Sequence, residues 1–344
     1  MLSHSRKVLW IPVYTGMTRL TNQRNTVSTL FEDLEIQEIR ERLASLDATV
    51  RLIAVRDLAD VGDDSHAPLF VAALQDSAPE VRVEAAKALE SFETAPGVSA
   101  LVDALSDDVP AVREAAAHSL SELKLRASAA VLLPHASHPA SFVRAAILRA
   151  LRELKEPAAL DPALLALEEG NAVVRREAVS VLGYLKDTLA LEPLARVAAN
   201  DPEAEVRRAA IGALGFAAGT SVLPALVAGL RDPAWQVREE AATTLGKLGQ
   251  QGAGPALIEA LEDSYWQVRL RAARSLGRLR HGAAVQPLIA VLAHTISNLR
   301  KEAALALGEL RDPLALPALR ALEQDADPEV RKSVRLALSQ IDAA

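Results

Sequence analysis

Histidines and carboxylates that could hold a metal ion occur together at one place in the sequence. His135 and His138 are separated by two residues, and Asp107 and Asp108 stand about 30 residues earlier, in the preceding predicted turn. Closely spaced histidines beside carboxylates are able to bind zinc or iron. The alternative is that both histidines lie in an exposed turn, where His138 fills a position that is aspartate elsewhere in the chain. We favour the turn and expect no metal and no cofactor.

Arginine recurs along the chain with a nearly constant period. The steps are 31 residues, except for one of 32. Such a period indicates a stack of similar supersecondary units rather than a single globular core. The recurring residues are Arg51, Arg82, Arg113, Arg144, Arg175, Arg207, Arg238, Arg269, Arg300 and Arg331.

An aspartate precedes many of these arginines by six residues. We expect the arginine to lie at the edge of its helix and to reach the turn aspartate of a neighbouring unit, so that ion pairs form a ladder along the stack. The ladder is predicted to be structural, not catalytic. Its members are Asp76 and Arg82, Asp107 and Arg113, Asp201 and Arg207, Asp232 and Arg238, Asp263 and Arg269, and Asp325 and Arg331.

Each period contains two predicted helices. After the turn at Asp232, the residues Val237, Ala241, Leu245 and Leu248 recur at helical spacing and form one apolar stripe. A second helix, for example 221–230, carries proline in its first turn, where proline is tolerated. The sequence therefore predicts an all-α solenoid of about ten two-helix repeats.

Composition supports this fold and narrows the function. Half the residues are apolar but only 3% are aromatic, and alanine and leucine favour helix. A formal charge of −7 argues against nucleic acid as the ligand. The chain has no cysteine and no run of 18 apolar residues. We expect a cytoplasmic protein that does not bind membranes.

Residues 1–26 differ from the remainder. Trp10–Thr18 resembles the translation of a dispersed intergenic repeat of bacterial genomes. We expect 1–26 to be disordered or to be an over-extended start, with translation beginning near Met17 or Val27. The solenoid is assigned to 27–344.

The repeat of the form Asp-Pro-x-x-x-Val-Arg-x-x-Ala-Ala-x-x-Leu-Gly-x-Leu resembles HEAT repeats, and more narrowly the short HEAT-like repeats of phycobiliprotein lyases. The resemblance runs from about Leu34 to Ala344. It implies a right-handed superhelix whose arginine-bearing helices line the concave side. Four repeats depart from the aspartate pattern, with Ser45, His138, Glu169 and His294.

Two enzymatic interpretations follow from this resemblance. Deoxyhypusine hydroxylase has a similar architecture and binds iron through His-Glu dipeptides, but no histidine here precedes glutamate. A lyase or chaperone-like clamp acting on a cofactor-bearing protein stays open as an alternative, resting on fold analogy alone. No residue of this chain can be assigned to catalysis.

We expect instead that the concave face binds a protein or a peptide segment. In the fifth and sixth repeats, Arg176, Tyr184, Arg208 and Phe216 occupy positions predicted to face solvent. Arginine and aromatic residues dominate interface hot spots. The alternative for Tyr184 and Phe216 is that both rings turn back onto the core.

The seventh and eighth repeats extend the predicted surface. Trp235 and Trp266 begin equivalent helices, either as hydrophobic staples or as part of a binding edge. Residues 251–300 hold six basic and three acidic residues, whereas 51–100 hold four and nine, so the predicted surface is electrically polarised. The further candidates for partner binding are Tyr265, Arg271, Arg274 and Arg278.

Overall fold

The computed structural model describes residues 34–343, and these form helices joined by short turns without any strand. The predictions for 1–26 lie outside the described residues. A helix at 34–43 precedes a regular alternation of two kinds of helix. We call those that carry the periodic arginines the arginine helices and the others the partner helices.

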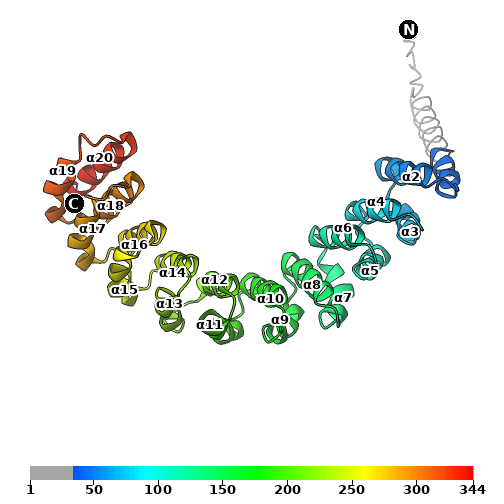
Figure 1. Cartoon of the computed structure of the whole chain (residues 1–344), viewed down its shortest axis with the longest axis horizontal. Coiled ribbons are helices and arrows are strands. Elements are labelled where there is room, and N and C mark those ends of the chain that lie inside the picture. The colour runs from blue at the N-terminus through cyan, green and yellow to red at the C-terminus, as the bar shows by residue number, and fades with distance from the viewer. Residues whose placement is uncertain (1–33, 344) are drawn as a thin grey trace, which may run out of the picture. The chain divides into compact units, whose positions relative to one another are not determined.

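The chain divides into two compact units, at Glu122 and Leu123. In unit 1 the arginine helices pack against one another in sequence, and the partner helices lie on one side of them (Figure 1). The arginine helices are α2 (Ala48–Val61), α4 (Pro79–Ala88) and α6 (Pro110–Ser121), and the partner helices are α3 (Ala67–Ala73) and α5 (Ala95–Ala104). The 3-10 turns are η1 (Asp64–His66) and η2 (Leu89–Ser91).

Unit 2 repeats the same arrangement. Its arginine helices are α8 (Ser141–Leu154), α10 (Ala172–Leu185), α12 (Ala204–Ala213), α14 (Trp235–Leu248), α16 (Trp266–Leu279), α18 (Ser297–Leu310) and α20 (Pro328–Asp342). Its partner helices are α7 (Ala129–Leu132), α9 (Leu160–Ala166), α11 (Leu191–Asn200), α13 (Leu223–Gly229), α15 (Gly254–Glu259), α17 (Val285–Val291) and α19 (Leu316–Ala321). Figure 1 shows the arginine helices of unit 2 side by side along its inner edge.

Short 3-10 turns lead into the partner helices of unit 2 or extend the end of a helix. They are η3 (Arg126–Ser128), η4 (Leu133–His135), η5 (Pro157–Ala159), η6 (Thr188–Ala190), η7 (Leu214–Phe216), η8 (Gln251–Ala253), η9 (Ala260–Glu262), η10 (Gly282–Ala284) and η11 (Pro313–Ala315).

The core consists of the apolar stripes that the period predicts. Val237, Ala241 and Leu245 are fully buried between α14 and its neighbours, while Leu248 is half-buried. Because each stripe is covered by the adjoining helix pair, no repeat buries its apolar face alone. The sequence period therefore becomes a continuous core within each unit.

Close approach between successive arginine helices depends on glycine near their C-terminal ends. A Cβ atom on Gly277 of α16 would lie 2.8 Å from the Cα of Ala306 in α18, and one on Gly308 would lie 2.8 Å from the Cα of Ala337 in α20. Both distances are shorter than real Cβ contacts, so these positions require glycine for the observed spacing.

The 32-residue step is accommodated in one partner helix. Helix α11 has ten residues, whereas the partner helices α9, α13, α15, α17 and α19 have six or seven. The longer helix places Asp201 26 residues after Arg175 instead of the usual 25. The insertion therefore leaves the contact between these two residues intact.

Candidate partner-binding surface

Six arginines clamp an aspartate of the following repeat. In each pair the Nε donates to Oδ2 at 2.6–2.8 Å and Nη2 donates to Oδ1 at 2.7–2.9 Å. This is the two-bond geometry in which arginine holds carboxylates most firmly. The pairs are Arg51 with Asp76, Arg82 with Asp107, Arg175 with Asp201, Arg207 with Asp232, Arg238 with Asp263, and Arg300 with Asp325.

The aspartate six residues before an arginine contacts that arginine through its backbone. Arg113 Nη1 donates to the carbonyl of Asp107 at 2.7 Å, and Arg331 Nη1 donates to that of Asp325 at 2.6 Å. Arg269 bonds the carbonyl of Asp263 through Nε. Each ladder aspartate therefore offers its carbonyl to its own repeat and its carboxylate to the preceding one.

The repeats without aspartate keep part of this arrangement. Asp232 Oδ1 accepts a bond from the amide of Ala234 at 2.8 Å, which closes the turn. His138 and His294 accept the equivalent amide bonds through Nδ1, at 3.2 and 3.0 Å. Glu169 instead keeps the forward contact, accepting from Arg144 Nη2 at 2.9 Å. Ser45 accepts from the amide of Asp47 at 3.2 Å.

The histidines of the sequence motif belong to one turn. The carbonyl of His135 accepts a bond from the amide of His138 at 3.1 Å, and the ring of His138 is used in the turn closure described above. Across residues 34–343 there is no cluster of three or more potential metal ligands.

A second row of ion pairs links the arginine helices and was not predicted from the sequence. An arginine five residues after the ladder arginine pairs with a glutamate 28 residues further on. The pairs are Arg56 with Glu84, Arg149 with Glu177, and Arg274 with Glu302. Glu177 and Glu302 are only 4% exposed, which is rare for a carboxylate that is not paired. The repeated 28-residue spacing was the signal that could have revealed these pairs.

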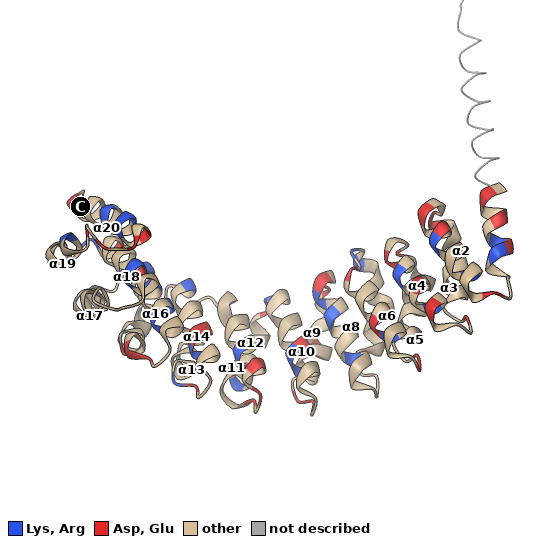
Figure 2. Ribbon diagram, turned by 45° about the horizontal axis from the view of Figure 1, so that its top comes forward, with Lys and Arg blue, Asp and Glu red and all other residues tan. Residues whose placement is uncertain are grey.

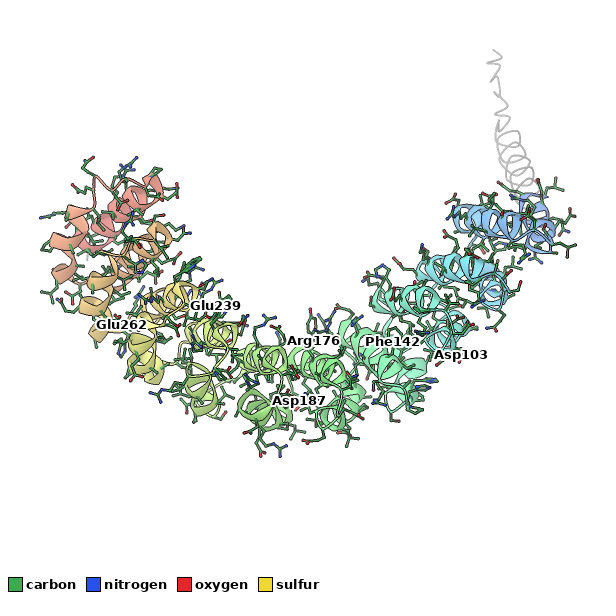
Figure 3. All side chains as sticks on the ribbon, in the orientation of Figure 1. Asp103, Phe142, Arg176, Asp187, Glu239 and Glu262 are labelled. Atoms are coloured by element: carbon green, nitrogen blue, oxygen red, sulfur yellow. The ribbon has the colours of Figure 1, made fainter. Side chains whose placement is uncertain are left out.

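Arg176 lies on the inner surface of unit 2, by which we mean the side of its arginine helices that faces away from the partner helices, and Arg208 holds the equivalent position in the next repeat. Both side chains are close to half exposed. Figure 3 shows Arg176 and Glu239 on this surface and Asp187 and Glu262 on the side of the partner helices. Each arginine has an acidic neighbour: Glu177 Oε1 lies 3.4 Å from Arg176 Nη2, and Glu205 lies 2.9 Å from Arg208.

The arginines predicted in the eighth repeat are largely engaged within the protein. Arg271 donates to Glu239 at 3.0 Å, and Arg274 Nε donates to Glu302 at 3.0 Å. Arg278 is exposed near Glu309, whose pKa is raised because burial of its carboxyl outweighs the nearby arginines. Figure 2 shows acidic and basic segments next to each other along these helices. The excess of basic residues in the sequence is therefore partly neutralised by ion pairs.

Tyr184 and Phe216 line one cleft on the inner surface. The cleft has a volume of about 460 Å³ and lies between the C-terminal ends of α10 and α12. Tyr184 is 46% exposed and Phe216 is half-buried, so neither ring is absorbed into the core. The guanidinium carbon of Arg152 lies 5.5 Å from the centre of the Tyr184 ring, within the range of a cation–π contact.

The two equivalent tryptophans of the seventh and eighth repeats, Trp235 and Trp266, do not stack on each other. Trp235 stacks on Tyr265, with ring centres 5.5 Å apart and an interplanar angle of 14°. The guanidinium carbon of Arg238 lies over the Tyr265 ring, 5.6 Å from the ring centre. Trp266 begins α16 and is 38% exposed. Trp235 therefore links two repeats through its ring.

Sequence reasoning also missed an exposed apolar pair at the start of two arginine helices. Phe142 and Val173 stand at equivalent positions, two residues before Arg144 and Arg175, and are 43% and 45% exposed. Their shared position in the repeat was the available signal.

Among residues 34–343, no helix combines the length and the hydropathy that a membrane-spanning segment requires.

Comparisons with known proteins agree with this architecture. The sequence matches the profile of HEAT repeats over 36–121, 95–152, 129–215, 160–246, 191–265 and 254–339. No curated protein sequence matches the chain.

Among solved structures, Kap95p in complex with RanGDP aligns with a TM-score of 0.64 at 14% identity, covering 89% of this chain and 49% of Kap95p. Kap121p bound to the extreme C-terminus of the phosphatase Cdc14p gives 0.63 at 16%, with 89% and 41% covered. The YibA protein of E. coli gives 0.52 at 20%, with 84% and 96% covered. The chain thus spans about half of Kap95p, and at these identities the likeness is one of fold.

Proposed function

The chain belongs to the HEAT-repeat family, and from this premise we propose that it is a non-catalytic scaffold that binds a protein or peptide segment along the inner surface of unit 2. The observation that carries the proposal is the exposure of arginine and aromatic side chains there. Arg176, Arg208 and Tyr184 are each 45–46% exposed. These residue types supply most of the binding energy in protein interfaces.

The fold explains why these side chains are available for a partner. The apolar stripe, the ladder arginine and the second row of ion pairs are used in the stack, whereas the positions of Arg176, Arg208 and Tyr184 belong to none of these. Arg176 and Arg208 each follow a ladder arginine directly, and both side chains are close to half exposed. A formal charge of −7 favours protein over nucleic acid as the partner.

The karyopherins that resemble this fold supply a precedent. Kap95p and Kap121p are solved in complexes with RanGDP and with the C-terminus of Cdc14p. We carry over only the principle that such a solenoid offers a surface to a protein chain. The identity of the partner is to be found by experiment.

The test is affinity purification from cells that express the protein. We expect the wild-type chain to retain a stoichiometric partner, and the double variant Arg176→Glu, Arg208→Glu to lose it. Arg196→Glu with Arg231→Glu is the matched control, since it changes the charge equally on exposed positions in and beside the partner helices. Loss of the partner in the control as well, or its retention in both variants, contradicts the proposal. A chromophore bound to the purified protein would instead support the lyase-like clamp.

A further inference from the structure

One position of the arginine helices carries a long side chain in seven of the ten repeats and a short one in three consecutive repeats, two of which border the cleft. It lies five residues after the ladder arginine. Ser180 and Gly212 stand there in the fifth and sixth repeats, next to each other in unit 2, and both line the cleft of Tyr184 and Phe216. In chain order the ten residues at this position are Arg56, Lys87, His118, Arg149, Ser180, Gly212, Thr243, Arg274, Leu305 and Leu336.

The opening at Gly212 leaves one glutamate without the arginine that its equivalents have. Glu240 occupies the position of Glu177 and Glu302, but the residue 28 positions before it is glycine. A Cβ atom on Gly212 would lie 3.1 Å from Glu240 Oε1. The arginine–glutamate pair that joins successive arginine helices at three other places in the chain is therefore absent where the cleft lies.

The walls and rim of the cleft have a definite chemistry. Tyr184 and Phe216 are its aromatic walls, and its small lining residues include Gly183, Gly212, Gly215, Ala209 and Ala213. The charged residues that line it are Arg152, Lys186 and Lys247, all of them basic. Lys247 lies across Gly215, with its Nζ 3.2 Å from the place of a Cβ atom there.

Resting on the proposed function, we propose that this cleft, which we call the Tyr184 cleft, takes one aromatic side chain of an acidic partner segment. The small lining residues allow a ring to lie between Tyr184 and Phe216, where offset or edge-to-face contacts are favourable. Carboxylates on either side of that ring meet the basic residues at the rim. A volume of about 460 Å³ holds one large side chain with its adjacent backbone.

The charges select against other occupants. A cationic segment would meet three basic side chains and no acidic lining residue. A single-stranded nucleic acid could stack on the same rings, but three basic side chains are few for the phosphates of a strand, and the chain carries a formal charge of −7. We therefore commit to an acidic peptide, with nucleic acid as an outcome that would contradict the proposal.

The direct test uses the full chain and a fluorescein-labelled peptide Asp-Glu-Phe-Asp-Glu, followed by fluorescence anisotropy. Replacing Phe by Ala in the peptide should weaken binding roughly tenfold or more, because an aromatic side chain loses its buried site. Replacing the acidic residues by lysine should abolish binding. Failure of the acidic Phe peptide to bind, or tighter binding of the lysine peptide or of a ten-nucleotide oligothymidylate, would overturn the proposal.

Two variants separate a filled cleft from an unfolded protein. Gly212→Arg places a side chain in the cleft opposite Glu240, as Arg149 stands opposite Glu177. We expect at least a tenfold loss of peptide binding with an unchanged or higher Tm. Leu336→Arg is the matched control, because it adds the same charge at the same position four repeats later, where the side chain is 49% exposed and can accept a charge. This control should bind the peptide like wild type. Equal binding by wild type and Gly212→Arg would contradict the proposal.

The rim is tested by Lys247→Glu, which should weaken binding of the acidic peptide more than that of the neutral peptide Asn-Gln-Phe-Asn-Gln. Equal effects on the two peptides would refute the role given to the rim.

Failure of the cleft proposal can also be distinguished from failure of the scaffold proposal. If Gly212→Arg keeps the cellular partner while Arg176→Glu with Arg208→Glu loses it, the scaffold function stands and the Tyr184 cleft is not its anchor site.

Discussion

The Arg175–Asp201 pair offers the strongest test of what holds the repeats together. Its side chains are 9% and 3% exposed, and Arg175 donates two bonds to the carboxylate, at 2.7 and 2.9 Å. Asp201 Oδ1 also accepts the amide of Glu203 at 2.9 Å. One carboxylate thus joins two repeats and closes a turn.

The substitution Asp201→Ala removes all three bonds and leaves the guanidinium buried. Loss of one partner of a buried pair costs about 3–5 kcal/mol. Arg175 still donates to the carbonyls of Glu169 and Gly170, so we expect the lower end, about 3 kcal/mol. Asp201→Asn keeps the turn bond and one acceptor for Arg175, and we expect it to lose about 1–2 kcal/mol.

The control is an exposed pair with a similar sequence separation. Arg231 and Glu259 are 70% and 65% exposed and 2.9 Å apart. Exposed pairs contribute about 0–1 kcal/mol, so Glu259→Ala should have little effect. Urea unfolding followed by far-UV circular dichroism gives the change in stability, and hydrogen exchange of α10 and α12 locates it. Equal losses for Asp201→Ala and Glu259→Ala would refute the argument that burial sets the value of a ladder pair.

Two further predictions follow from the same packing. The hydrogen bond from Arg51 lowers the pKa of Asp76, and that from Arg300 lowers the pKa of Asp325. Because the folded pKa lies below the unfolded value of about 3.9, this stabilisation is present above that pH and is lost as the pH falls below it. As the pH is lowered below about 4, the urea midpoint of the wild-type protein should therefore decrease. In the double variant Asp76→Asn, Asp325→Asn the decrease per pH unit should be smaller, and an equal decrease would contradict the assignment. Gly277→Ala should cost about 1–3 kcal/mol by crowding Ala306. Gly170→Ala, where a Cβ meets nothing within 4 Å, should be close to neutral in the same unfolding assay, and equal effects would exclude crowding as the cause.

The repeat architecture was predictable because it depends on local periodicity. The stripe of Val237, Ala241 and Leu245 follows from helical geometry alone, and identical stripes every 31 residues can be buried only by stacking. The exposed position of Arg176 follows from the same helical register. The burial of the stripe and the exposure of Arg176 both follow from the position of each residue on its own helix.

Contacts between repeats depended on how the helices meet in space. We expected each ladder arginine to reach the turn aspartate of a neighbouring repeat, and the structure shows which neighbour this is: the carboxylate of Asp232 binds Arg207 of the preceding repeat, whereas its carbonyl binds Arg238. Trp235 stacks on Tyr265, and not on Trp266, its equivalent in the next repeat. In both cases more than one contact is compatible with the period of the sequence, so the packing of neighbouring repeats determines which contact forms.

The Tyr184 cleft depends on both sources of information. The 31-residue period already places aromatic residues at equivalent positions in the fifth and sixth repeats, beside the small Ser180 and Gly212. That these residues enclose a common volume with a basic rim became evident from the packed helices. Helical periodicity sets the direction of each side chain, whereas a cavity depends on the distance between helices, which the packing of many side chains sets together.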